Sequence, residues 1–204
     1  MIDYIRNFKY MESENNMKEE FIELLKQTNR DGIDKLLNWL EKSDFYKAPA
    51  STRFHGSYEG GLLEHSLNVY KCLKLKLSQE PYSKILNISE DTLIIISLLH
   101  DICKANYYTI EMRNKKNADG VWVKEPYYTV DDTIPYGHGE KSVMMINKFI
   151  ELSMEEMYAI RWHMGFSEPK ELHNTLSLVF EKYPLVLALH SADMEATYLL
   201  ENRG

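Results

Sequence analysis

A histidine and an aspartate lie side by side, His100 and Asp101, directly after the apolar run 93–99. An imidazole nitrogen and a carboxylate oxygen both bind divalent cations, and two adjacent ligands can hold one cation from neighbouring directions. Four further candidate ligands stand in other segments of the chain: His65, His138, His163 and Asp193. A lone buried histidine is more often a hydrogen-bonded core residue, and a helical aspartate a cap, so a metal site requires that these six side chains meet.

Asp193 is the most informative of the six candidates. Apolar residues at helical spacing around it, Leu185, Leu189, Ala192 and Ala196, predict a largely buried helix. An unpaired carboxylate in that position would be costly or would be forced to take up a proton. A divalent cation removes this penalty, and the sequence therefore favours a buried metal centre.

The composition predicts one domain over residues 1–204, because 204 residues with 44% hydrophobic content suffice for a sizeable core. Two cysteines are too few for a disulfide framework. The net charge of −7 argues against extensive nucleic-acid binding but allows a small anionic substrate. Apolar runs shorter than the roughly 20 residues that span a bilayer, and a start that lacks a signal-peptide pattern, predict a cytoplasmic protein without membrane contact.

Helical periodicity dominates the chain and predicts an all-α fold. An N-terminal helical hairpin is expected within residues 1–45, with helices over 14–28 and 33–43, and a metal-binding core over 46–204. In the core, Gly60 and Gly61 precede a helix whose inward face carries His65, and Ser89 caps the apolar helix that ends at His100. Later helices are expected over 139–150, 154–164, 174–181 and 184–201, the second starting with a Ser153–Glu156 capping box.

A short β-hairpin is predicted as an insertion around 107–128. Segments 107–113 and 121–128 are rich in aromatic and β-branched residues on either side of the Asp119–Gly120 turn signal. Pro126 cannot donate to a strand ladder, so its strand should lie at an edge or break there. The tyrosines of this region suggest either a lid that stacks on a base or, with somewhat more weight, cross-strand packing; they are Tyr107, Tyr108, Tyr127, Tyr128 and Tyr136.

The order of these ligands resembles that of the HD-domain metal-dependent phosphohydrolases: a histidine, then a His-Asp doublet, then a distant aspartate. The matching segments are GGLLEHS around His65, the doublet His100-Asp101, and HSAD ending at Asp193. His138 and His163 occupy the places of the two additional histidines in the two-metal subgroup. The His-Asp dipeptide alone is weak evidence for this family, whereas the ordered set of segments is a specific signal for it.

The resemblance implies an HD-domain helical bundle that holds one or two divalent ions. Asp101 would bridge the two ions, one completed by His65, His100 and Asp193 and the other by His138 and His163. Nitrogen and oxygen ligands permit Mn, Fe, Mg, Co, Ni or Zn. Such a centre hydrolyses phosphoesters by attack of metal-bound hydroxide.

Three residues near the ligands are candidates for substrate contact. Lys104 lies three residues after Asp101, where its ammonium can neutralise a phosphoryl oxygen or simply interact with the helix dipole. Arg53 and His55 precede the Gly-Gly helix, and contact with phosphate or a leaving group weighs evenly against a structural loop role. His190, one turn before Asp193, is expected to orient that carboxylate.

The sequence therefore predicts a metal-dependent phosphohydrolase that cleaves a phosphomonoester or phosphodiester, plausibly of a nucleotide or short oligonucleotide. Two alternatives stay open. The same ligands can hold a diiron centre that activates dioxygen, as in the HD-type oxygenases, or the chain can be a nucleotide-binding HD module without catalysis. The substrate and the oligomeric state are not encoded in these spacings.

Overall fold

The apolar run 93–99 forms the centre of helix α5 (Glu90–Leu99) in a computed structural model that describes residues 16–201. Every residue of the run is buried, because its helix is covered on all sides by other elements. Ser89 caps the helix as predicted, its hydroxyl accepting from the backbone N–H of Thr92 at 3.2 Å. The helix therefore carries His100 and Asp101 into the interior.

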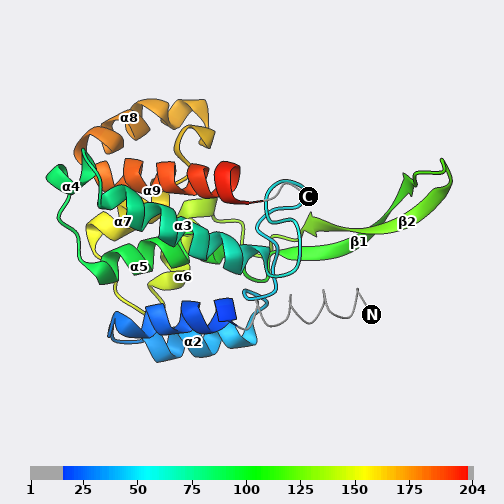
Figure 1. Ribbon diagram of the computed structural model, residues 1–204, viewed down its shortest axis with the longest axis horizontal. Helices are drawn as coiled ribbons and strands as arrows, with labels where there is room; N and C mark the ends of the chain where they lie inside the picture. The colour runs from blue at the N-terminus through cyan, green and yellow to red at the C-terminus, as the bar shows by residue number, and fades with distance from the viewer. Residues whose placement is uncertain (1–15, 202–204) are drawn as a thin grey trace.

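The helices around α5 form the body of the molecule (Figure 1). Helix α3 (Gly61–Leu77) packs against α5 and against α9 (Pro184–Glu195). Helix α7 (Met154–Trp162) contacts α5, α9 and α6 (His138–Ile146). Among residues 16–201 the other α-helices are a helix over 16–27, α2 (Ile33–Lys42), the short α4 (Tyr82–Ile85) and α8 (His173–Lys182).

Two glycines allow α3 to begin close to the preceding loop. Gly60 caps the helix in the left-handed region, at φ 82°. A Cβ on Gly61 would lie 2.1 Å from the carbonyl oxygen of Gly56, a distance at which no side chain fits. The Gly-Gly start therefore fixes the loop over the first turn of the helix, and His65 lies on the buried face as predicted.

The predicted β-hairpin is present and longer than expected. Strand β1 (Tyr108–Lys116) pairs antiparallel with β2 (Trp122–Val130) in a two-stranded sheet that extends away from the helices (Figure 1). Pro126 lies opposite Met112 in an unbroken ladder, which is possible because each strand of a two-stranded sheet is an edge. The fold is thus mostly helical with a hairpin.

Several predicted helix ends are wrong. Helix α6 ends at Ile146 rather than 150, because the Asn147 side chain accepts from the backbone N–H of Leu152 at 3.1 Å and turns the chain. Helix α9 ends at Glu195 rather than 201 and continues as a π-helical turn, Ala196–Leu200. Within the N-terminal hairpin, residues 1–15 lie outside the described residues. Among residues 16–201, no helix is long and apolar enough to cross a bilayer.

An ion pair between the buried Glu156 and the half-buried Arg30 ties the N-terminal hairpin to the ligand-bearing helices. Glu156, fully buried at the start of α7, pairs with the Arg30 guanidinium and accepts from Thr92 Oγ1 at 2.9 Å. It also accepts from the backbone N–H of Ser153 at 2.8 Å, which completes the predicted capping box. The carboxylate of Glu156 therefore joins three segments.

Arg30→Met is expected to lower the free energy of unfolding by about 3–5 kcal/mol, because Glu156 would be left as a buried charge without its cation. Urea denaturation of the variant measures this loss. Adding Glu156→Gln to Arg30→Met should recover part of it, since the amide carries no charge. A loss below about 1 kcal/mol, typical of exposed pairs, would contradict a stabilising role for this contact.

Candidate metal centre

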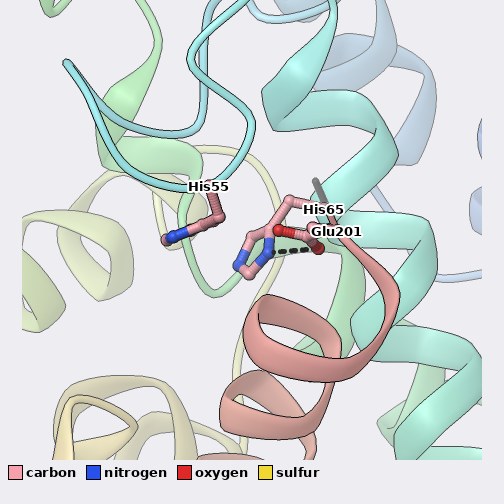
Figure 2. Close-up of side chains that lie close together, drawn as sticks. All are labelled: His55, His65 and Glu201. Carbon is pink, nitrogen blue, oxygen red and sulfur yellow. Dashed lines mark hydrogen bonds and ion pairs between the residues drawn. The ribbon is translucent and has the colours of Figure 1, made fainter. Parts of the chain in front are cut away.

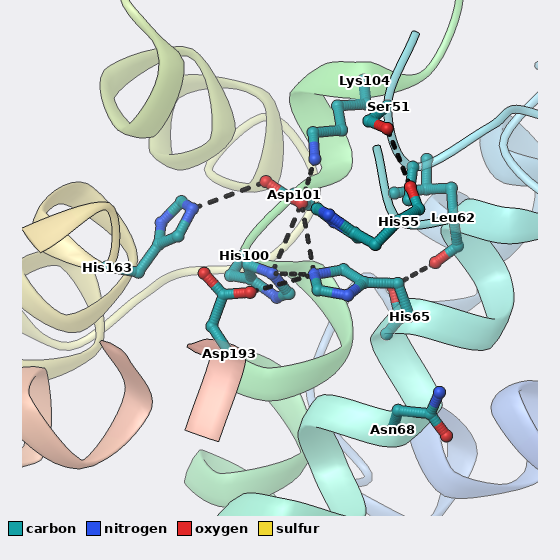
Figure 3. Close-up of polar contacts among 12 residues, drawn as sticks. Ser51, His55, Leu62, His65, Asn68, His100, Asp101, Lys104, His163 and Asp193 are labelled. Atoms are coloured by element: carbon teal, nitrogen blue, oxygen red, sulfur yellow. Dashed lines mark hydrogen bonds and ion pairs between the residues drawn. The ribbon is translucent and has the colours of Figure 1, made fainter. Parts of the chain in front are cut away.

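Five elements bring the six predicted ligands into one cluster. Figure 3 shows those other than His138. Helix α3 supplies His65, and the end of α5 supplies His100 and Asp101. The remaining three come from the first residue of α6, the end of α7 and the body of α9: His138, His163 and Asp193. Their ligand atoms form overlapping groups of three in which all atoms lie within 4.8 Å of one another.

Asp101 lies at the centre of the cluster, and its two oxygens face different histidines. Oδ1 is 2.6 Å from His138 Nε2 and 3.4 Å from His163 Nε2. Oδ2 is 3.6 Å from His65 Nε2 and 3.5 Å from His100 Nε2. The carboxylate is therefore placed between two separate pairs of imidazoles.

Hydrogen bonds outside the cluster fix the tautomers of three histidines. His100 Nδ1 donates to the carbonyl of Ser97 at 2.8 Å, and His163 Nδ1 donates to the carbonyl of Ile160 at 2.6 Å. His65 Nδ1 donates to Glu201 Oε1 at 2.9 Å (Figure 2). In each neutral ring the proton is on Nδ1, so the Nε2 lone pair faces the cluster.

The inward Nε2 atoms lie close to one another and to the carboxylates of the cluster. His65 Nε2 and His100 Nε2 lie 3.2 Å apart, and His163 Nε2 is buried without a hydrogen-bond partner within the described residues. Unprotonated nitrogens and carboxylate oxygens that converge in this way repel one another unless a cation or protons lie among them. The donor set therefore fits a divalent metal.

The charges of the cluster shift the pKa values of its members. Burial lowers the pKa of His65, but the hydrogen bonds and charges of Asp193 and Glu201 outweigh burial and raise that pKa to about 10. Burial also lowers the pKa of His138, but the charge and the hydrogen bond of Asp101 outweigh this effect and raise that pKa to about 9. The pKa values of Asp101 and Asp193 lie below their usual range, because nearby cationic groups outweigh the opposing effect of burial.

The metal-free protein is expected to be most stable between about pH 4.5 and 6.5. The raised pKa values of His65 and His138 give stability that is complete below their ordinary value of 6.5 and is lost as pH rises through about 9 to 10. The lowered pKa values of Asp101 and Asp193 give stability that is lost as pH falls below 3.8. Thermal melts of chelator-treated protein across this range measure the profile. Saturating Mn²⁺ should remove the alkaline loss, and a metal-free melting temperature that rises from pH 6.5 to 9 would contradict the expectation.

Glu201 is a site residue that the sequence did not reveal. It is buried, follows the π-helical turn, and holds His65 Nδ1 at 2.9 Å, with Asn68 Nδ2 at 3.4 Å (Figure 2). The π-helical turn between Asp193 and Glu201 changes the helical phase, so the spacing in the sequence gave no signal. A carboxylate on the outer nitrogen of a metal-binding histidine orients the ring and raises its basicity.

Glu201→Ala is expected to weaken metal binding by about 10- to 100-fold, because His65 would lose the partner that orients it. Competition with a chelating dye measures the affinity. Glu201→Gln should recover much of it, since the amide oxygen still accepts from Nδ1. The matched control is Glu195→Ala, which removes a carboxylate paired with Lys76 at 2.7 Å. This variant should bind metal with the affinity of the wild type. An unchanged affinity in Glu201→Ala would contradict the role.

A cleft of about 480 Å³ opens onto the cluster. Lys104 lines it, with Nζ 2.7 Å from Asp101 Oδ2. His55 lines the opposite loop, held there because Ser51 Oγ donates to the His55 carbonyl at 2.8 Å (Figure 3). Burial lowers the pKa of His55, with help from the charges of His65 and Lys104, so its ring is neutral at pH 7. The cleft thus offers the Lys104 ammonium and the neutral His55 imidazole beside His65, Asp101 and Asp193.

The other predicted contacts fall outside this cleft or differ from expectation. Arg53 is exposed and lines a separate hollow beside the hairpin. The expectation for His190 is wrong: it lines the cleft, but Nδ1 donates to the carbonyl of His163 at 2.7 Å instead of to Asp193. None of the five tyrosines of the hairpin region lines the cleft, so the lid interpretation has no support in this geometry.

One curated protein gives a partial match to the chain. The match is 42% identical over 65 residues to the dihydroneopterin 2',3'-cyclic phosphate phosphodiesterase of Methanocaldococcus jannaschii. It covers 30% of this chain and 25% of that protein, well under two thirds of the relative's length. No family model matches the chain, and no solved structure gives a significant match. The chain is therefore similar over a limited segment to a phosphodiesterase.

Proposed function

We propose that this protein is a metal-dependent phosphohydrolase and that its ligand-bearing helices form one HD-type domain. The observation that carries the proposal is the convergence of the Nε2 atoms of His65, His100 and His163 on the carboxylate of Asp101. Such a set of buried nitrogens and carboxylate oxygens needs protons or divalent cations among its members.

Two groups of side chains would hold the metal. His65, His100 and Asp193, together with Asp101, would hold one ion, and His138 and His163, together with Asp101, would hold a second. A bound divalent cation supplies Lewis-acid chemistry toward a phosphoryl oxygen and toward water. The imidazole and carboxylate ligands permit Mn, Fe, Mg, Co, Ni or Zn.

The cleft residues supply the rest of the chemistry. Lys104 Nζ, beside Asp101, is placed to neutralise negative charge on a phosphoryl oxygen as it builds up in the transition state. His55 presents a neutral ring whose Nε2 is buried and has no hydrogen-bond partner within residues 16–201, so it can bond a polar atom of the substrate. Both roles are local to the cleft and need no movement of the helices.

The substrate class follows from the cleft and from the partial relative. A cleft of about 480 Å³ admits a molecule of nucleotide size. The similarity to a cyclic phosphate phosphodiesterase supports a phosphodiester over a phosphomonoester. We therefore propose a small phosphodiester, nucleotide-like, as the substrate.

A panel of phosphate esters tests this function. Chelator-treated protein would be reloaded with Mn, Mg, Fe, Co, Ni or Zn and assayed against cyclic nucleotides, dinucleotides, mononucleotides and bis(p-nitrophenyl) phosphate. We expect hydrolysis of at least one diester with at least one metal. Iron-dependent consumption of dioxygen without ester cleavage would replace the proposal by an oxygenase, and tight nucleotide binding without turnover would replace it by a binding module.

A further inference from the structure

A second hollow, of about 400 Å³, lies between the β-hairpin and the loop that precedes α3. We call it the hairpin hollow, and its lining residues fall into two sets. The loop supplies Thr52, Arg53 and Ser57, and the hairpin supplies Ile110, Arg113, Lys115, Glu125, Pro126, Tyr127 and Tyr128. Nothing in the chemistry of the metal centre uses these residues.

The charge of the hairpin hollow is opposite to that of the chain. Three cations, Arg53, Arg113 and Lys115, face one carboxylate, Glu125, although the whole chain carries a net charge of −7. Glu125 lies 3.0 Å from Arg113 Nη2 and 3.0 Å from Lys115 Nζ, so this one carboxylate forms ion pairs with both hairpin cations. The hollow therefore keeps an excess of positive charge, which favours an anionic ligand.

Arg53 and Arg113 differ in the contacts that their guanidinium groups make with the protein. The Arg113 guanidinium lies over the Tyr127 ring, 5.2 Å from its centroid, and the Tyr127 hydroxyl donates to Glu111 at 3.0 Å. Arg113 is thus held in place. Across the described chain Arg53 forms no hydrogen bond or ion pair, and its five N–H donors are free for a ligand. A guanidinium binds phosphate with two parallel hydrogen bonds.

The same loop forms part of both hollows. Phe54 and His55 line the cleft over the metal ligands, whereas Thr52, Arg53 and Ser57 line the hairpin hollow. Neighbouring residues of one loop therefore face the two spaces. One loop therefore separates the two spaces, and a substrate that extends past this loop would present a second group to the hairpin hollow.

We propose that the hairpin hollow is a second phosphate-binding site, which takes a phosphate group of the substrate other than the one that is hydrolysed. The assignment to a substrate rests on the proposed phosphohydrolase function. Arg53 and Arg113 bind the phosphate oxygens, and Tyr127 holds Arg113 in position. The site would make the protein prefer diesters that carry an additional phosphate.

Pyrophosphate binding to metal-free protein tests the site without relying on activity. Titration calorimetry should detect binding to the wild type, weakened about tenfold in Arg53→Gln. Glu125→Gln should bind more tightly, because Arg113 and Lys115 are released. The matched charge control is Lys35→Gln, on the exposed face of α2, which should bind pyrophosphate as the wild type does. Equal affinity in wild type and Arg53→Gln, or no binding at all, would overturn the proposal.

A pair of substrates separates failure of the site from failure of the function. Dinucleotides with and without a 5'-phosphate would be compared by kcat/KM in metal-loaded protein, and the phosphorylated one should be preferred about tenfold in the wild type and not in Arg53→Gln. Hydrolysis of both without preference, together with no pyrophosphate binding, would overturn the site and leave the function. Pyrophosphate binding that depends on Arg53, without hydrolysis of either dinucleotide, would overturn the function and leave an anion site.

Discussion

Asp101→Asn is expected to lower both metal content and kcat/KM by more than about 100-fold, since loss of even an outer-shell partner costs 10- to 100-fold. Asp101 is buried, and its two oxygens face the two pairs of histidines. An amide has the same shape but carries no charge, so it cannot balance two cations. Metal analysis after dialysis and hydrolysis of bis(p-nitrophenyl) phosphate measure the two losses.

Asp34→Asn, a change of an exposed aspartate on α2, is the matched control and should behave as the wild type does. Circular dichroism should show that Asp101→Asn keeps its helices, because the surrounding apolar packing is unchanged. Wild-type metal content in Asp101→Asn would remove Asp101 from the site.

Lys104→Met is expected to reduce kcat by about 100-fold while metal content is kept. Lys104 Nζ lies 2.7 Å from Asp101 Oδ2 and lines the cleft, so the ammonium is available to a phosphoryl oxygen but is not itself a ligand. Methionine keeps most of the length of the side chain and removes the charge. Steady-state kinetics and metal analysis on the same preparation check both parts.

Lys74→Met, which removes an exposed ammonium in the last turn of α3 that pairs with Glu90 at the start of α5, should leave kcat unchanged. A Lys104→Met variant that loses its metal would assign Lys104 to the assembly of the centre rather than to the substrate. An unchanged kcat would show that the Lys104 charge interacts only with the helix dipole and not with the substrate.

Most of the fold was predictable because it depends on local signals. The unbroken apolar run of α5 predicted a helix buried all round, and Ser153 with Glu156 predicted the start of α7. The ends of α6 and α9 were not predictable from periodicity, since a side-chain cap by Asn147 stops the first and a π-helical turn changes the phase of the second. The hairpin strands were predicted too short because their polar ends, such as Lys115, lack a β pattern.

The candidate site was predictable as a set of residues but not as a set of contacts. The ordered histidines and aspartates indicated the six side chains that the fold brings together. Glu201 was missed because its contact with His65 joins residues 136 positions apart, which no spacing encodes. The contact of His190 was predicted wrongly for the same reason: helical spacing placed it beside Asp193, whereas the turn after α7 brings the carbonyl of His163 to it.

Two further residues make contacts beside the site. Arg161 pairs with Glu140 and Glu168, each at 2.6 Å. Cys103 is buried, and its Sγ contacts His138 Nδ1 at 3.3 Å. These contacts stabilise the start of α6, where His138 lies, and the end of α7, where His163 lies.

The most direct test of the account is a titration of chelator-treated protein with Mn²⁺, in which bound metal and hydrolysis of bis(p-nitrophenyl) phosphate are measured together. The account predicts no activity without metal, and activity that rises with bound metal and stops rising when the sites formed by the six ligands are filled. Full metal loading without hydrolysis of the diester, or the same hydrolysis in the metal-free protein, would contradict it.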